Sequence, residues 1–468
     1  MVIGQSLLSL ILRPVAPLFF AMTEPTLSPP VAVPCLPPMD AQRTELHNEV
    51  HARPPARIRL PALVVLVVVL NDTVSREQEW AHLRRLPGQQ DLALEALQGN
   101  FLRLRLGGHT LKWERHSEYT RYVLVQPLPE GAGLGAEEPD LLTGMLVGTD
   151  WLASIPGRTM AAVQTALVEH PLDDAPAALA LAQRWLGGGT VVASLMGHGH
   201  SLAVTRFQLR DDGFERMVLV MPPGTTETRA GRVSQRLLEM EIYRLMALRG
   251  LPVAKSLAAP LAEAERALAD VTAQLDAHQE SEQVLLDTLI SVAAKVERAT
   301  AESMYRFSAT LAYDGLVRQR ITEMREKAIP GTQTLGEFMQ RRLSPAMATV
   351  AATAQRLNAL SARIERASSL LRTRVDIATE HQNQQLLAKL TRGQDLQLSL
   401  QTTVEGLSIA AISYYVISLV LYGGKAAKAA GLPLNPEMLA GASIPLVLWA
   451  VWKATQRVHA RLHGPNPH

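Results

Sequence analysis

Two histidines, His47 and His51, have the spacing in this sequence that most directly suggests chemistry. Residues four apart share one face of a helix, and a pair of histidines placed in this way can bind zinc. In the zinc-protease pattern a glutamate directly follows the first histidine, whereas Glu49 lies about 180° around a helix from the mean direction of the pair. Arg53-Pro54 would also end a helix just beyond His51. Metal binding by His47 and His51 is therefore the minor alternative, and a hydrogen-bonded polar turn is the main prediction.

Two glycine-rich strings invite a phosphate or metal interpretation. Gly187 to Gly189 lacks the Lys-Ser/Thr of a phosphate-binding loop and the spacing of a dinucleotide fingerprint, and Gly197 to His200 is a short Gly-His repeat. We predict that both strings are turns. No nucleophile-elbow motif occurs, and the single cysteine, Cys35, excludes an intrachain disulfide or a CxxC redox pair. The sequence thus predicts no catalytic residue, no cofactor and no enzyme activity.

A third pattern follows one face of an apolar segment near the carboxyl end. Small and polar residues recur there at alternating steps of three and four, and with Val404 they form one helical stripe. The stripe comprises Gln401, Ser408, Ala411, Tyr415, Ser418 and Tyr422. Because a polar face is costly against lipid, we expect the stripe to pack against other helices or to line a pore. Either alternative requires a homo-oligomer.

Residues 41–227 predict a mixed α/β cytoplasmic domain. The β-branched run Ala62–Leu70 is typical of a strand buried on both faces. A helical pattern over 73–97, interrupted at Pro87-Gly88, follows it. A hairpin turning at Gly107-Gly108 and a third strand come next, and a similar round of elements occupies 160–221. The two rounds would suit two sheet-bearing halves. Residues 1–40, by contrast, predict a disordered leader or a wrongly assigned start.

Helical patterns fill the chain from 228 to 405, which we predict to be a stalk with coiled-coil character. One tract runs from 258 to 327, interrupted only by Pro260 and Gly315, and after Pro345 no proline occurs as far as Leu421. A helix of about 75 residues would be on the order of 100 Å long. Such a helix must pair with other helices or with copies of itself. Together with the α/β domain, this stalk makes the predicted fold class α+β.

Two uncharged apolar segments close the chain, Leu407–Tyr422 and Met438–Trp452. Each lies near the lower length limit for a membrane-spanning helix, and Tyr or Trp beside Lys marks their ends. We therefore predict a two-span anchor in the lipid bilayer over 406–456, with a buried core hairpin as the alternative. The tail 457–468 is basic, which places it and the long amino-terminal part in the cytoplasm by the positive-inside rule. A net charge of +2 gives no reason to expect nucleic acid.

Several strings resemble a bacterial family of membrane-anchored proteins, the domain-of-unknown-function family numbered 3422. The first is ELHNEVHARP at 45–54, in which His47, Glu49, His51, Arg53 and Pro54 carry the resemblance. The others are RFSATLAYDGLVRQRI at 306–321, TLGEFMQRRLSPAM at 334–347, LLRTRVDI at 370–377 and QTTVEGLSIAAISYYV at 401–416. The resemblance covers about residues 41–460. It implies an anchor in the bacterial inner membrane and no known catalytic activity.

The order of elements is also similar to that of CorA-type magnesium channels. Those channels carry Gly-Met-Asn after the first span, where this chain has Tyr422-Gly423-Gly424, and Lys425 and Lys428 stand in place of an acidic loop. Two hypotheses follow: a membrane-anchored, self-associating interaction or scaffold protein, and a CorA-like oligomeric channel or sensor for an unidentified ion. The sequence favours the first.

Overall fold

The computed structural model describes residues 37, 39–43, 46, 57–277, 281–431, 433 and 435–462. The chain divides into two compact units, one formed by Met1–Ile242 with Arg318–Phe338 and the other by Tyr243–Val317 with Met339–His468. In the described part of the chain every strand lies in the first unit, and the second unit is helical. The predicted combination of a mixed α/β region with long helices is confirmed.

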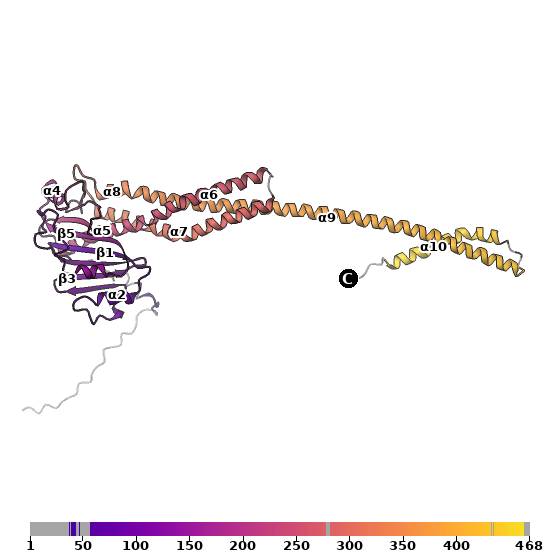
Figure 1. The fold of residues 1–468 in the computed structure, drawn as a ribbon, viewed down its shortest axis with the longest axis horizontal. Helices are drawn as coiled ribbons and strands as arrows, with labels where there is room; N and C mark the ends of the chain where they lie inside the picture. Colours follow the sequence, from indigo (N-terminus) through magenta and orange to yellow (C-terminus); the bar gives the residue numbers. More distant parts are fainter. Residues whose placement is uncertain are drawn as a thin grey trace, which may run out of the picture. The chain divides into compact units, whose positions relative to one another are not determined.

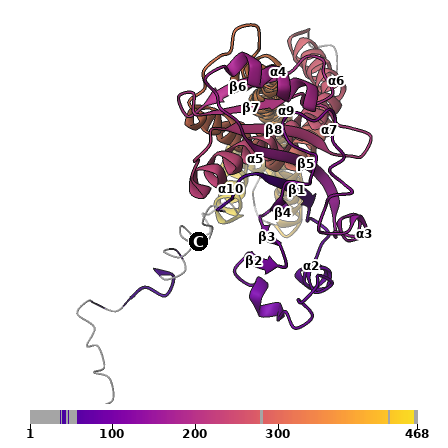
Figure 2. The ribbon, with the colours of Figure 1, turned by 90° about the vertical axis from the view of Figure 1, so that its left-hand side faces the viewer.

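One sheet of eight strands forms the first unit, in the order β2-β3-β4-β1-β5-β8-β7-β6, which can be followed in Figure 2. Neighbouring strands are antiparallel except β5 and β8, which are parallel. The two predicted rounds of elements form the two halves of this single sheet, β1–β4 and β5–β8, which join through the pairing of β1 with β5. The strands are β1 (Ala62–Leu70), β2 (Phe101–Leu106), β3 (His109–Arg115), β4 (Tyr119–Pro127), β5 (Arg158–Glu169), β6 (Val192–Met196), β7 (Ser201–Thr205) and β8 (Glu215–Met221).

From residue 57 onwards, the helices that accompany the strands are α2 (Arg76–Leu83), α3 (Thr149–Ala153), α4 (Ala175–Trp185) and α5 (Glu227–Leu248). A capping box between Ser75 and Gln78 starts α2. This helix ends at Leu83, shortly before the predicted interruption at Pro87-Gly88, where Gly88 has a φ of 74°. A 3-10 turn, Leu94–Leu97, follows before β2.

The central strand β1 is buried along its whole length, as its β-branched sequence predicts. Leu63 and Val65 belong to the large apolar core that includes Trp185 of α4. Leu66 faces the opposite side of the sheet and lines a crevice together with Leu238 of α5. Short helices and the 128–157 connection therefore cover one face of the sheet, and α5 packs on the other.

The edge strand β6 pairs with a segment that returns after the long helices. The backbones of Leu195 and Lys327 exchange two hydrogen bonds, of 3.0 and 2.8 Å. Glu326, half-buried, accepts the hydroxyl of Ser194 at 3.1 Å, and burial raises the pKa of this glutamate. The segment Arg318–Phe338 thus covers a strand edge that would otherwise present unpaired backbone groups.

Three long helices pack in the second unit, α6 (Gly250–Ala277), α7 (Glu282–Met324) and α9 (Ser344–Ala429), with the short helix α8 (Leu335–Arg342) before α9. The single helical tract predicted over 258–327 is two helices, since α6 ends at Ala277 and α7 begins at Glu282. Arg356 of α9 forms a two-pronged ion pair with Glu265 of α6, with both contacts at 2.7 Å. The buried residues of the packed helices are Leu261, Leu268, Leu285, Leu289, Leu357, Leu360, Ile364 and Leu371, with smaller neighbours.

The helix α9 continues without interruption for 86 residues, as the absence of proline predicts, and at ~1.5 Å per residue it is about 130 Å long. Its buried positions stop at Leu371 and resume only at Ser413. Figure 1 shows this long orange helix running beyond α6 and α7. The described helices of the unit therefore cover only the beginning of α9 and its far end.

Candidate functional site

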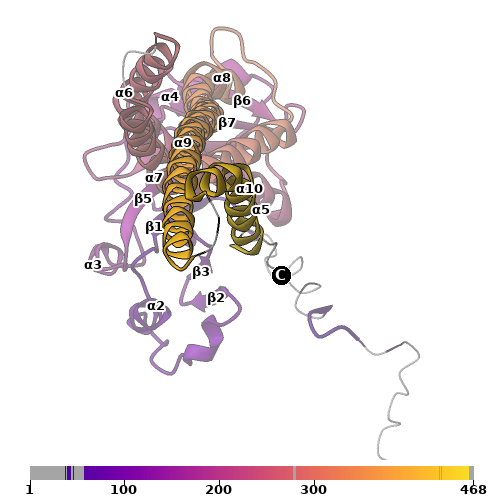
Figure 3. The same cartoon turned by 90° about the vertical axis from the view of Figure 1, so that its right-hand side faces the viewer.

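A helical hairpin forms the far end of the second unit, with α10 (Pro436–Leu462) lying along the end of α9 (Figures 1 and 3). The contact buries Ser413 and Gly424 of α9 and Ala440 and Val447 of α10. A Cβ atom on Gly424 would stand 3.4 Å from Pro436. This is an ordinary van der Waals distance, so the two helices are in contact near the turn without any need for glycine at this position.

The predicted stripe lies on the other side of α9 from this contact. Successive helical residues turn by about 100°, so Tyr415 and Ser418 lie about 160° and about 140° around the helix from the buried Ser413. Tyr415 and Tyr422 are 68% and 67% exposed. Ser418 is half-buried and donates its hydroxyl to the carbonyl of Tyr414, at 2.8 Å, within its own helix. The remaining stripe residues are also exposed: Gln401, Ser408 and Ala411.

Two helical runs are long and apolar enough to cross a membrane, one ending at Ala429 and the other being Pro436–Val458. The core helix of a soluble protein can pass the same test, but such a helix is mostly buried. Here only 6% and 11% of the most apolar windows are buried. Lys425 lies 5.8 Å from the ring of Tyr422, and Lys453 lies 4.6 Å from the ring of Trp449. Aromatic and basic side chains of this kind are typical of membrane–water interfaces.

The part of α9 before the hairpin, residues 372–412, contains no buried residue. It exposes nine apolar side chains to between 58% and 68%. Long helices in water gain most of their stability from packing an apolar face rather than from helix propensity. This segment therefore lacks, within the described part of its own chain, the packing that a helix of its length needs. The nine side chains are Ile377, Leu386, Leu387, Leu390, Leu396, Leu398, Leu400, Val404 and Leu407.

The string at 45–54 is not placed by the structure. His47, Glu49, His51, Arg53 and Pro54 all lie outside the described residues. The polar-turn interpretation of the histidine pair, and the metal alternative, therefore stay predictions.

Both glycine-rich strings are turns, as predicted. Gly197, His198 and Gly199 have φ angles of 59°, 64° and 103° and join β6 to β7. The Nε2 atom of His198 lies 3.1 Å from the guanidinium of Arg325. Gly187 to Gly189 follow α4 with φ angles of 85°, 73° and 75°. Three successive left-handed residues require glycine, so the string ends a helix and needs no ligand to explain it.

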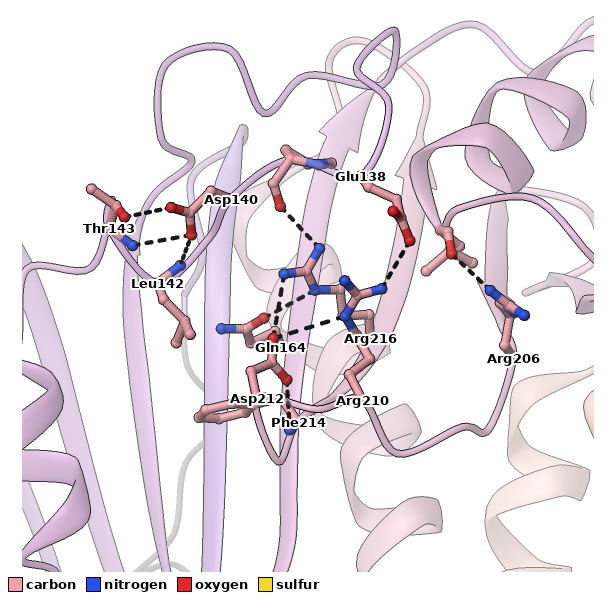
Figure 4. Close-up of polar contacts among 12 residues, drawn as sticks. Glu138, Asp140, Leu142, Thr143, Gln164, Arg206, Arg210, Asp212, Phe214 and Arg216 are labelled. Carbon is pink, nitrogen blue, oxygen red and sulfur yellow. Dashed lines mark hydrogen bonds and ion pairs between the residues drawn. The ribbon is translucent and has the colours of Figure 1, made fainter.

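An ion-pair cluster joins the loop around residue 139 to β8 (Figure 4). The guanidinium of Arg216 donates to the carbonyl of Pro139 at 2.9 Å and lies 3.6 Å from Asp212. Arg210 pairs with Glu138 at 3.1 Å. Because these cations and carboxylates pair with one another, we assign the cluster a structural role in holding the loop over the sheet.

A comparison with known protein families shows to which family this chain belongs. A family model described as a protein of unknown function (DUF3422) matches residues 38–462. The chain belongs to the DUF3422 family. The resemblance expected from the sequence is thereby confirmed, and the match includes both apolar helices at the carboxyl end. No curated protein and no solved structure matches the chain, so DUF3422 membership brings no activity with it.

Sequence reasoning missed a buried ionic network on the α5 face of the sheet in this DUF3422 chain. The carboxylate of Glu114 contacts Arg121 and, at 3.1 Å, the ammonium of Lys112. Arg121 lies 3.6 Å from Glu239 of α5, which also accepts the Nε of Arg320 at 2.7 Å. Lys112 and Glu114 are two residues apart in β3 and therefore share one face. That spacing was the available sign of an ion pair in the sequence. Only the fold shows that the face shared by the two residues is buried.

A second cluster missed from the sequence lies on the opposite face, around the buried His82 of α2. Neither ring nitrogen of His82 has a hydrogen-bond partner among the described residues. The ring lies 4.2 Å from that of Trp151, whose Nε1 donates to the His82 carbonyl at 3.2 Å, and meets the edge of Tyr122 at 6.1 Å. Burial, and secondarily Arg85, lowers the pKa of His82 to about 4. The imidazole is therefore neutral in the folded protein at pH 7.

The titration of His82 predicts that the sheet unit becomes less stable as the pH falls. The unfolded chain binds this proton below an ordinary pKa near 6.5, whereas the folded chain binds it only near 4. The contribution of His82 to the free energy of unfolding is therefore complete above pH 6.5. It falls by about 3 kcal/mol as the pH drops to about 4. We expect His82→Phe, which keeps a ring but has no proton to bind, to unfold with a flatter pH dependence over that interval. Urea unfolding of both full-length proteins at several pH values measures the difference. Nearby Glu79, Arg85 and Arg115 are present in both proteins, so their contributions to the pH dependence cancel in the comparison. Equal slopes would contradict the prediction.

Proposed function

We propose that this protein is a membrane-anchored scaffold that self-associates through α9. The observation that carries the proposal is the position of the stripe from Gln401 to Tyr422, on the side of α9 that α10 leaves uncovered. In a bilayer an uncovered polar and small-residue face would meet lipid, which cannot satisfy tyrosine hydroxyls. Partner helices from further copies of the chain would cover it, and small residues allow their backbones to approach closely.

The exposed segment of α9 before the hairpin supports the same proposal. Its nine apolar side chains, from Ile377 to Leu407, lack a partner in the described part of the chain. Pairing with the equivalent segment of another copy would bury them and continue the helix packing that ends at Leu371. The scaffold would thus hold its sheet units together at the end of a shared helical stalk.

We place the anchor in a bacterial inner membrane, with the sheet unit and the tail on the cytoplasmic side. Two spans leave both ends of the chain on the same side, and the tail after Trp452 carries Lys453, Arg457 and Arg461. Basic residues next to a span favour the cytoplasm. Lys425 and Lys428 lie near the end of α9, on the opposite side of the membrane, and weaken this preference without reversing it.

A CorA-like oligomeric channel is the alternative, because the uncovered stripe could also line a pore. Against it, Tyr422-Gly423-Gly424 lacks the asparagine of the CorA signature, and the last turns of α9 carry lysines in place of acids. The proposed scaffold requires the stripe to pack tightly, whereas a pore requires it to stay open to water. The two functions therefore differ in how they respond to a larger side chain.

Ser418→Leu is the substitution that tests the scaffold. Under the proposal it overfills the helix contact and weakens the oligomer by about 1–3 kcal/mol, which cross-linking in native membranes measures. Leu419→Ile is the matched control, because Leu419 is 69% exposed about 100° further around the helix and either shape suits lipid. An intact Ser418→Leu oligomer that loses ion flux into proteoliposomes would favour the channel. If assembly and flux are both unchanged, the stripe makes no contact and the proposed self-association is wrong.

A further inference from the structure

A groove opens at one end of the sheet, where β1 and β3 begin and β2 and β4 end. Its volume is about 650 Å³, within the range of small-molecule sites. The groove lies in the sheet unit alone and shares no residue with the helices of the proposed anchor. Its lining comprises Arg59, Leu60, Pro61, Ala62, Arg105, Leu106, Gly108, His109, Thr110, Val125, Gln126, Pro127 and Leu128.

Three basic side chains line this groove, Arg59, Arg105 and His109, and no Asp or Glu is among its described lining residues. Arg59 and Arg105 are exposed and form no ion pair or hydrogen bond with another described residue. Both ring nitrogens of His109 are shielded from solvent and also lack a partner among the described residues. The groove therefore presents two arginine guanidinium groups whose charge the rest of the described unit does not neutralise. This differs from the cluster of Figure 4, where arginines and carboxylates pair.

The strand register places one of the arginines beside neutral and apolar neighbours. Arg105 stands opposite Thr110, and Thr110 stands opposite Val125, so the three form one row across β2, β3 and β4 on the same face. Gln126 is already committed, because its amide nitrogen donates to the carbonyl of Gly144 at 2.7 Å and its oxygen accepts the N–H of Leu146 at 2.9 Å. The groove thus offers a ligand cationic and hydroxyl groups at one place, and an apolar surface that includes Val125 at another.

We propose that this groove binds a small organic phosphate. The donors of two guanidinium forks match the several oxygens of a phosphoryl dianion better than the two oxygens of a carboxylate. The apolar wall, Leu60, Leu106, Val125 and Leu128, would hold the organic part of the same ligand. This inference is independent of the proposed function of the helices, since it rests on the sheet unit alone.

Calorimetric titration of phenyl phosphate tests the groove, with the full-length protein in nanodiscs of neutral phosphatidylcholine and empty nanodiscs as the blank. We expect one saturable site per chain. Inorganic phosphate should bind more weakly because it lacks the apolar part, and benzoate should bind more weakly because it offers fewer acceptor oxygens. If inorganic phosphate or benzoate binds as tightly as phenyl phosphate, the assignment of an organic phosphate is wrong. Absence of saturable binding would overturn the site altogether.

Substitution of the arginines locates the binding. Arg59→Gln and Arg105→Gln should each weaken phenyl phosphate binding at least about tenfold, as loss of a charge-assisted hydrogen bond predicts. Both side chains are exposed and unpaired, so the substitutions leave the fold intact, which circular dichroism checks. Arg184→Gln is the matched control, because Arg184 is an exposed arginine on α4 that does not line the groove. Equal affinities in all three variants and the wild type would place the anion elsewhere and refute the proposal.

Discussion

Replacing Glu114 by Gln should lower the free energy of unfolding of the sheet unit by about 3–5 kcal/mol. The side chain of Glu114 is completely buried, and it contacts Arg121 and Lys112, whose side chains are only 7% and 8% exposed. Burial alone would raise the pKa of Glu114, but Arg121 and Lys112 outweigh it and hold that pKa below its ordinary value. The amide would leave two cations buried with a single remaining carboxylate, Glu239, 3.6 Å from Arg121. Urea unfolding of the full-length protein, followed by near-ultraviolet circular dichroism, measures the loss.

The matched control for this substitution is Asp72→Asn, which breaks an ion pair at the surface. Asp72 lies 2.9 Å from Arg158, and their side chains are 53% and 68% exposed. Water and salt screen such a pair, so its loss should change the free energy of unfolding by about 0–1 kcal/mol. If Glu114→Gln destabilises no more than Asp72→Asn, the network on the α5 face contributes nothing beyond an ordinary surface pair.

Local sequence patterns were sufficient to predict the strands. The run Ala62–Leu70 could be assigned to a strand buried on both faces because β-branched residues occupy both sides of it, and β1 is buried throughout. The hairpin between β2 and β3 followed from Gly107-Gly108, since a tight turn between antiparallel strands favours glycine. Local patterns do not specify which strands pair over long distances. The joining of two rounds into one sheet through β1 and β5 was therefore not predictable in this way.

The break between α6 and α7 was missed for a different reason. No proline or glycine lies between Ala277 and Glu282, so the sequence carries none of the usual residues that end a helix. Conversely, Pro260 and Gly315 suggested interruptions, yet both lie inside helices, in α6 and α7. Tertiary packing, as between Arg356 and Glu265, outweighs local propensity in such helices.

The two candidate sites, the stripe on α9 and the groove of the sheet unit, also differed in whether the sequence could predict them. The stripe on α9 was predictable because its residues share one helix and a fixed spacing. The groove was not predictable, because Arg59, Arg105 and His109 come from three different segments that only the register of the sheet brings together. Single-sequence patterns find sites on one element more readily than sites assembled from several.

The central claim is that the two apolar helices at the carboxyl end anchor the protein in a membrane. Only 6% and 11% of the residues in their most apolar windows are buried within the described chain. Two spans would bury far more apolar surface in lipid than peripheral binding allows. Deletion of residues 403–468 removes both spans and leaves the packed beginning of α9, up to Leu371, intact.

Carbonate washing of membranes, followed by flotation of the washed membranes on a density gradient, is the measurement that tests this claim most directly. We predict that the full-length protein floats with the membranes after the wash, whereas the protein lacking residues 403–468 is released into the supernatant. Flotation separates true insertion from aggregation, because aggregates sediment. A full-length protein that carbonate releases into the supernatant would contradict the anchor, and with it the proposed assembly of the α9 stripe within the bilayer.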